Sequence, residues 1–177
     1  MWAALFIAPI FLAAASGVFA EVSADPDGTA GIVRGRVDIE APPAVVWNVI
    51  LDCRRARRMA PNVQSCKVLD RAADGSWDLR EMIVAPPLVP KVRSVFRSSY
   101  DPVKRITFKC AGGDVKVCEG EWRLTALPSG GTRVAYTNRA SSPYPAIPAG
   151  LTRDAMKNDM VRALKALRRE CLAAAAE

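Results

Sequence analysis

Residues 37–70 read VDIEAPPAVVWNVILDCRRARRMAPNVQSCKVLD, and this stretch decides the fold. Apolar and charged residues alternate up to Ile39, which is the pattern of a β-strand with one buried face. Two prolines follow, and then apolar residues at helical spacing. Proline is common in the first turn of a helix, so this segment predicts a helix. Residues 54–59 predict a second, short basic helix, and a new strand begins near residue 63. The stretch therefore predicts the order strand, helix pair, strand.

The rest of the chain predicts further strands followed by one long helix. The first strand covers residues 31–41. Alternating segments separated by Gly, Asp and Pro predict antiparallel strands joined by hairpins, at residues 63–70, 77–84, 91–100, 105–110, 118–124 and 132–140. From about residue 149 to residue 175 the apolar spacing becomes helical. We expect one domain over residues 31–177, preceded by a short segment, residues 21–30.

The first 20 residues carry no charged side chain and are almost entirely apolar. They end in Val18-Phe19-Ala20, a pattern of small residues that suits signal peptidase. We expect a signal peptide over residues 1–20 that is cleaved after Ala20, which places the mature protein in the periplasm or outside the cell. The alternative is an uncleaved membrane anchor, because the segment lacks an N-terminal Lys or Arg.

Charge and composition exclude several functions. The net charge of +7 indicates attraction to anionic surfaces, and outside the cytosol we expect such a surface to be phospholipid or another envelope polymer. No zinc-finger spacing or aromatic RNA-binding strand is present, so we expect no nucleic-acid partner. The chain has no histidine, which excludes His-based hydrolase chemistry and His metal ligands. We expect no metal and no cofactor.

The chain has five cysteines, all after the apolar leader. In an oxidising compartment, Cys53 and Cys66 are positioned to link the helix pair to the sheet, and Cys110 and Cys118 to face each other across a hairpin. The alternative is that each is a small buried apolar side chain. Spacing alone does not fix the connectivity.

Several short motifs along the chain carry a family resemblance. They are residues 39–42 (IEAP), 46–47 (VW), 61–63 (PNV), 105–108 (RITF), 120–124 (GEWRL) and 147–148 (IP). In this order the chain resembles the START-like (SRPBCC) superfamily, in its polyketide cyclase/dehydrase and coenzyme Q-binding, lipid-transport branch. The resemblance implies an α+β helix-grip fold, in which a curved antiparallel sheet of about seven strands wraps around the C-terminal helix. It also implies a cavity for hydrophobic ligands, although members include carriers, quinone-binding proteins and cyclases.

The inward faces of such a sheet and helix supply candidate ligand-binding residues. These are Val92, Phe96, Phe108, Trp122 and Tyr136 on the strands, and Met156, Met160 and Leu164 on the helix. The alternative is that these side chains simply fill the core. We assign no catalytic residue, because the alternation puts nearly every charged side chain on the outer faces. Glu81 is ambiguous, since its neighbours favour opposite faces of that strand.

A membrane contact is also predicted. Arg54, Arg55, Arg57 and Arg58 in the short helix, with Leu88 and Val89 in an apolar loop, form a candidate surface for anionic lipid. The alternative is a solvated basic helix beside an ordinary proline-rich turn.

These observations predict an exported domain that binds a lipid or quinone-like molecule as a carrier or chaperone, with no catalytic residue assigned. The first rival hypothesis is an enzyme of the cyclase or aromatase kind, which acts on a polycyclic or polyketide-like substrate without histidine. The second is an envelope interaction module whose interior is filled by side chains. The oligomeric state stays open.

Overall fold

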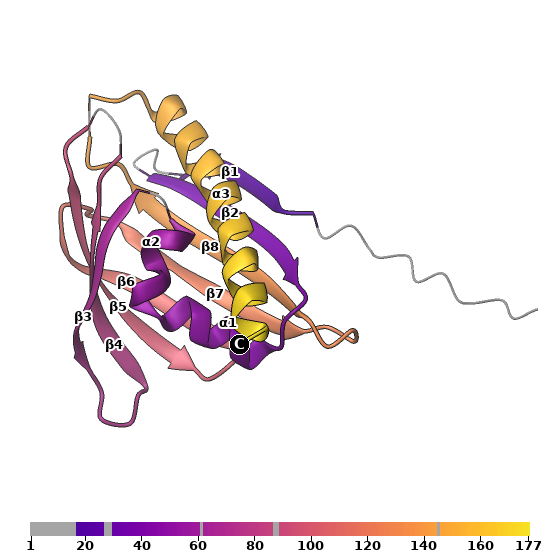
Figure 1. The fold of residues 1–177 in the computed structure, drawn as a ribbon. Coiled ribbons are helices and arrows are strands. Elements are labelled where there is room, and N and C mark those ends of the chain that lie inside the picture. The colour runs from indigo at the N-terminus through magenta and orange to yellow at the C-terminus, as the bar shows by residue number, and fades with distance from the viewer. Residues whose placement is uncertain (1–16, 27–29, 61, 87–88, 145) are drawn as a thin grey trace, which may run out of the picture.

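The computed structural model describes residues 17–26, 30–60, 62–86, 89–144 and 146–177, which form one curved sheet with helices on its inner side (Figure 1). All strand pairs are antiparallel, in the order β1-β2-β8-β7-β6-β5-β4-β3. The strands are β1 (Phe19–Ala24), β2 (Ala30–Ile39), β3 (Val63–Arg71), β4 (Trp77–Val84), β5 (Val92–Asp101), β6 (Arg105–Gly113), β7 (Cys118–Ala126) and β8 (Thr132–Ser141). The helices are α1 (Pro43–Leu51), the 3-10 turn η1 (Cys53–Arg55), α2 (Ala56–Met59) and α3 (Ala149–Ala175). The predicted α+β arrangement, a sheet wrapped around a long C-terminal helix, is confirmed.

The sheet has eight strands, whereas the sequence predicts about seven. The additional strand is β1, which pairs along β2 from Phe19 opposite Arg36 to Ala24 opposite Gly31. The sequence pattern assigns the first of these residues to the end of an export signal. In the structure Val18, Ala20 and Val22 pack against the hydrophobic core.

The predicted second helix, residues 54–59, is divided into two shorter elements. Asp52 ends α1, and its Oδ1 accepts a hydrogen bond from the backbone N–H of Arg54 at 2.9 Å. This bond caps η1 and turns the chain, so that only Ala56–Met59 forms an α-helical turn.

Helix α3 lies directly on β2, because two glycines leave room for it. A Cβ at Gly35 would lie 2.7 Å from Leu164 Cδ1, and one at Gly31 would lie 3.0 Å from Met156 Sδ. Leu164 and Leu167 are almost fully buried and join Val37 and Val134 in the core. The spacing of α3 is thus as predicted, and the glycines of β2 decide which side of the helix contacts the sheet.

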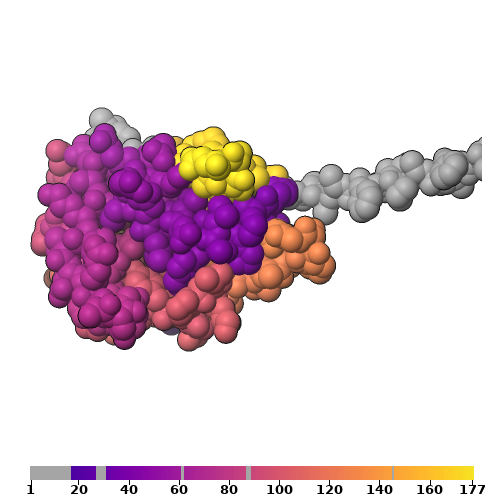
Figure 2. All heavy atoms as spheres, turned by 60° about the horizontal axis from the view of Figure 1, so that its bottom comes forward, coloured from indigo at the N-terminus to yellow at the C-terminus, as the bar shows by residue number. Residues whose placement is uncertain are grey.

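The C-terminal end of α3 packs against the segment that holds α1, η1 and α2, as the yellow and violet atoms in Figure 2 show. Glu170, which is 8% exposed, accepts a hydrogen bond from Arg58 Nε at 2.8 Å and forms an ion pair with Arg55 Nη1 at 3.5 Å. This cluster ties the short helices to the end of the long one. No helix in the described ranges combines the length and the apolar character that crossing a membrane requires.

Cys171 on α3 is a buried free thiol, with no exposed surface. Burial raises its pKa to about 12, so almost no thiolate exists near neutral pH. We expect iodoacetamide to modify no cysteine of the native protein and one cysteine of the denatured, unreduced protein, as measured by intact mass. Labelling of the native protein would show that the helix opens readily.

Candidate functional site

A cavity of about 510 Å³ lies between the inner face of the sheet and the helices. Strands β3 to β8 supply one wall, and α1, η1, α2 and α3 supply the other. The lining is mostly apolar and includes Ile50, Met59, Met82, Ile106 and Leu167. The interior is therefore hollow, in contrast to the filled interior that the interaction-module hypothesis requires.

Six of the eight predicted ligand-binding residues line this cavity, namely Val92, Phe96, Phe108, Trp122, Tyr136 and Met160. Met156 and Leu164 do not, because they occupy the side of α3 that packs onto Gly31 and Gly35 of β2. The adjacent side of the helix, with Ala163 and Leu167, faces the cavity. The sequence pattern groups these two sides of the helix into one stripe.

Aromatic rings form a continuous part of the wall. Phe96 contacts Phe108 edge to face at a centroid distance of 6.2 Å, and Phe108 stacks on Tyr136 at 6.0 Å. The ring centroids of Trp122 and Tyr136 lie 4.2 Å apart. Gly120 makes room for this packing, since a Cβ there would lie 2.8 Å from Phe108 Cζ. Offset and edge-to-face ring pairs of this kind give a rigid apolar surface.

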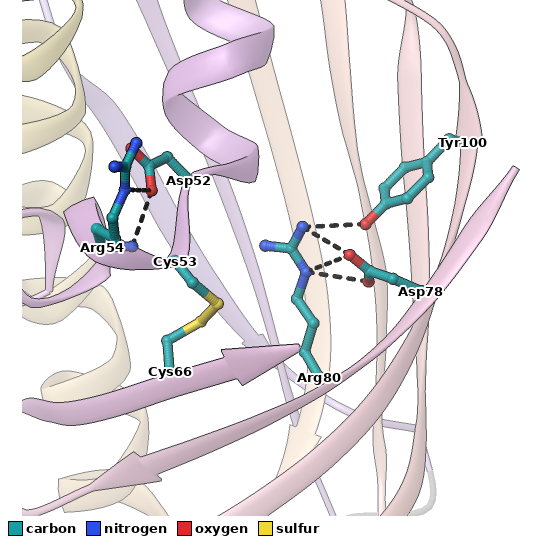
Figure 3. Close-up of a disulfide and its surroundings, with 7 residues drawn as sticks. All are labelled: Asp52, Cys53, Arg54, Cys66, Asp78, Arg80 and Tyr100. Atoms are coloured by element: carbon teal, nitrogen blue, oxygen red, sulfur yellow. Dashed lines mark hydrogen bonds and ion pairs between the residues drawn. A yellow bond between two sulfur atoms is a disulfide. The ribbon is translucent and has the colours of Figure 1, made fainter. Parts of the chain in front are cut away.

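A polar corner, formed by Asp78, Arg80, Ser98 and Tyr100, interrupts the apolar lining. Tyr100 is a candidate from the sequence, as a donor that could orient a head group, whereas the charged pair Asp78 and Arg80 is not. Asp78 is 5% exposed and Arg80 is 8% exposed. Arg80 Nε donates to both carboxylate oxygens of Asp78, at 3.0 Å and 2.8 Å, and Arg80 Nη2 donates to the Tyr100 hydroxyl at 3.2 Å (Figure 3). Arg80 and Ser98 line the cavity.

The expectation that charged side chains face outward is wrong for Asp78 and Arg80. On β4 the side chains of Met82 and Val84 face the cavity. Because side chains alternate between the two faces of a strand, Asp78 and Arg80 lie on this same inner face. Glu81 lies on the opposite face, where it forms an ion pair with Arg93 at 2.6 Å. Continuing the alternation from Met82 toward the start of the strand is the signal that could have identified the corner.

Burial keeps the phenols of Tyr136 and Tyr100 neutral. Burial raises the pKa of Tyr136, and a hydrogen bond with Asn138 offsets this only in part. Burial also raises the pKa of Tyr100, and its hydrogen bond with Asp78 adds to this effect. Burial disfavours the Arg80 cation, but its hydrogen bonds and charge interactions with Asp78 and Tyr100 outweigh this, so its pKa is raised. Near neutral pH the corner therefore holds a guanidinium and a phenol, and no phenolate.

The arginines predicted to touch a membrane are mostly paired with carboxylates. Arg54 pairs with Asp52 at 3.0 Å, and Arg55 and Arg58 pair with Glu170. Arg57 is exposed. Leu88 lies outside the described residues, and Val89 is half-buried. Arg55 and Arg58 thus tie the short helices to α3 through Glu170, and the contact with anionic lipid stays a prediction.

Both cysteine pairings considered from the sequence are formed, Cys53–Cys66 and Cys110–Cys118. The first ties η1 to β3 and the second links β6 to β7. Three of the four bridged cysteines line the cavity: Cys53, Cys66 and Cys118. Two disulfides in one small domain indicate a location outside the cytoplasm.

A family model described as polyketide cyclase/dehydrase and lipid transport matches residues 39–165. The match begins at the end of β2 and extends into α3, so it spans nearly every element that lines the cavity. No curated protein sequence matches the chain.

Solved structures with the same fold come from proteins of different kinds. The protein TTHA0849 of Thermus thermophilus is 27% identical, with a TM-score of 0.68 over 81% of this chain and 98% of that one. A STAR-related lipid transfer protein of Xanthomonas axonopodis is 20% identical, with a TM-score of 0.77 over 90% of this chain and 96% of that one. The Zhui aromatase/cyclase of Streptomyces sp. R1128 is 18% identical, with a TM-score of 0.64 over 82% of this chain and 93% of that one.

Proposed function

The chain belongs to the polyketide cyclase/dehydrase and lipid transport family, and from this membership we propose that it binds and carries a hydrophobic small molecule outside the cytoplasm. The ligand class is a lipid or a quinone-like compound. The observation that carries the proposal is the cavity of about 510 Å³ with its mostly apolar lining. Removing apolar ligand surface from water supplies the driving force, about 25 cal/mol per Å² before the costs of association.

The test is a change that fills the cavity and leaves the core in place. Ala163 lies on the cavity side of α3, whereas Lys165 on the same helix is exposed. We expect Ala163→Trp to occupy the ligand space and to weaken binding about tenfold or more, which corresponds to about 1.4 kcal/mol. Lys165→Trp adds the same side chain to the surface and serves as the matched control.

The measurement is mass spectrometry of the solvent extract of each protein, purified from the native host. We expect one apolar molecule to accompany the wild type and Lys165→Trp, and to be depleted in Ala163→Trp. Thermal unfolding of both variants confirms that the fold is intact. If the wild type carries nothing and takes up no apolar fluorescent probe, the carrier function is ruled out.

A cyclase-type enzyme is the second candidate, and the observation in its favour is the polar corner. Arg80 reaches into the cavity and donates hydrogen bonds, as a group that polarises a carbonyl must. Against it, Asp78 accepts hydrogen bonds from Arg80 on both oxygens, and the Tyr100 phenol stays protonated, so neither is a free base. Recovery of the ligand in a chemically altered form after incubation would favour the enzyme.

A further inference from the structure

Arg80 has hydrogen-bonding capacity that the protein does not use. Its Nε and Nη2 are taken up by Asp78 and Tyr100, and its Nη1 has no partner among the described residues. Among the described residues the buried side-chain polar atom without a partner is Asn138 Oδ1, so Arg80 Nη1 retains accessible surface, and Arg80 is one of the residues that line the cavity. In Figure 3 one terminal nitrogen of Arg80 points away from Asp78 and Tyr100, toward the side of the Cys53–Cys66 disulfide. A guanidinium has five N–H donors, and two of them thus face the ligand space.

The charge of Arg80 is already balanced. Asp78 lies at 2.8 Å from Arg80 Nη2 in a buried ion pair, so the two side chains together are neutral. Among the described residues that line the cavity, Arg80 is the only basic one. Asp52, the other charged lining residue, is negative and pairs with Arg54 and Arg55.

The balance of charge decides which head group the corner accepts. A carboxylate or phosphate at Arg80 Nη1 would lose its hydration and add a net negative charge beside Asp78, with no second cation to offset it. A carbonyl oxygen costs far less to desolvate and still receives a charge-assisted hydrogen bond. The corner therefore favours acceptors without charge.

The remaining space suits an extended apolar tail. Arg80 lies opposite Phe96 on β5, at the start of the aromatic wall that leads to Tyr136 on β8. Strands β4 and β8 are four strands apart in the sheet, a path of roughly 19 Å at the usual spacing between strands. A head group at Arg80 thus leaves most of the width of the sheet for a chain.

We infer that Arg80 binds an uncharged carbonyl group, of the ketone, ester or quinone type, at the head of an apolar ligand, and that Asp78 makes the corner select against anionic lipids. This inference rests on the proposed function and specifies the ligand class of the same cavity.

The test uses three probes with one chain length: dodecan-2-one, dodecanoate and dodecane, each competing with an apolar fluorescent probe for the full-length protein. We expect the wild type to bind the ketone about tenfold more tightly than the alkane, as a hydrogen bond to a charged donor provides, and more tightly than the carboxylate. We expect Asp78→Asn to reverse the order of ketone and carboxylate, because the Arg80 charge then has no internal partner. The double variant Asp78→Asn, Arg80→Met is expected to bind the ketone and the alkane equally.

Arg97→Met is the matched control, because Arg97 is exposed and stacks on Trp77 at 4.1 Å from the ring centroid. It is expected to keep the wild-type order. If the wild type prefers dodecanoate, or binds the ketone no better than dodecane, the inference is overturned while the carrier function stands. If no probe binds the wild type, the carrier function itself fails. The affinities of the wild type for the three probes can be compared without any variant, so the inference can still be overturned if Asp78→Asn does not fold.

Discussion

Replacing Gly120 with alanine is expected to lower the free energy of unfolding by about 3 kcal/mol, the upper end of the range for overpacked sites. Gly120 lies in β7 between Phe108 and Asn138 on the neighbouring strands. A Cβ at this position would lie 2.0 Å from the backbone oxygen of Thr137 and 2.8 Å from Phe108 Cζ. The ring can turn aside, but the oxygen belongs to the paired strand β8, so the sheet itself has to shift.

The measurement is urea unfolding followed by tryptophan fluorescence, with Gly112→Ala as the matched control. Gly112 lies in the adjacent strand β6, and the nearest atom to its Cβ would be Val95 Cβ at 3.8 Å, an ordinary contact. We expect this control to stay within about 0.5 kcal/mol of the wild type. Equal unfolding midpoints for the two variants would show that β7 and β8 pack more loosely than these distances require.

Removing the Cys53–Cys66 disulfide is expected to lower the free energy of unfolding by about 3 kcal/mol, which is the chain-entropy value for closing a loop of this length. The two cysteines are 13 residues apart, and both line the cavity. We expect the variant Cys53→Ala, Cys66→Ala to unfold at lower urea concentration and to release bound ligand faster, because η1 is no longer held to β3.

The second disulfide supplies the comparison for this prediction. Cys110 and Cys118 are 8 residues apart, so the same entropic argument gives a slightly smaller loss for Cys110→Ala, Cys118→Ala. We expect reduction of both disulfides in the wild type to lower the free energy of unfolding by the sum of the losses in the two double variants. If the first variant unfolds at the wild-type midpoint, the bridge contributes nothing to stability.

Alternation and proline signals were sufficient to predict most of the fold. The alternation predicts that Val33, Val37 and Ile39 on β2 face inward, and their exposed fractions of 3%, 0% and 1% agree with this. Strand β1 was missed for a physical reason, since one apolar segment meets the requirements of both an export signal and a half-buried strand. The division of the short basic helix was missed because it depends on one hydrogen bond to Asp52.

The candidate site was predicted less completely than the fold. The alternation of apolar and charged residues was enough to predict the aromatic wall, because it shows which side chains lie on the concave face of the sheet, where they line a core or a cavity. Alternation continued from Met82 places Asp78 and Arg80 on the inner face, but a buried Arg80 is stable only where Asp78 and Tyr100 complete its hydrogen bonds. The partner on β5, Tyr100, depends on the register between β4 and β5, which the predicted order of hairpins does not fix.

The position of β1 affects how the mature protein is defined. An export peptidase that cut after Ala20 would divide β1 between the discarded leader and the folded domain, leaving residues 21–24 to pair with β2. Val18 and Ala20, which pack against the core, would be lost with the leader. The predicted leader and the sheet edge share residues, so a recombinant protein meant to reproduce the complete sheet has to start upstream of Val18.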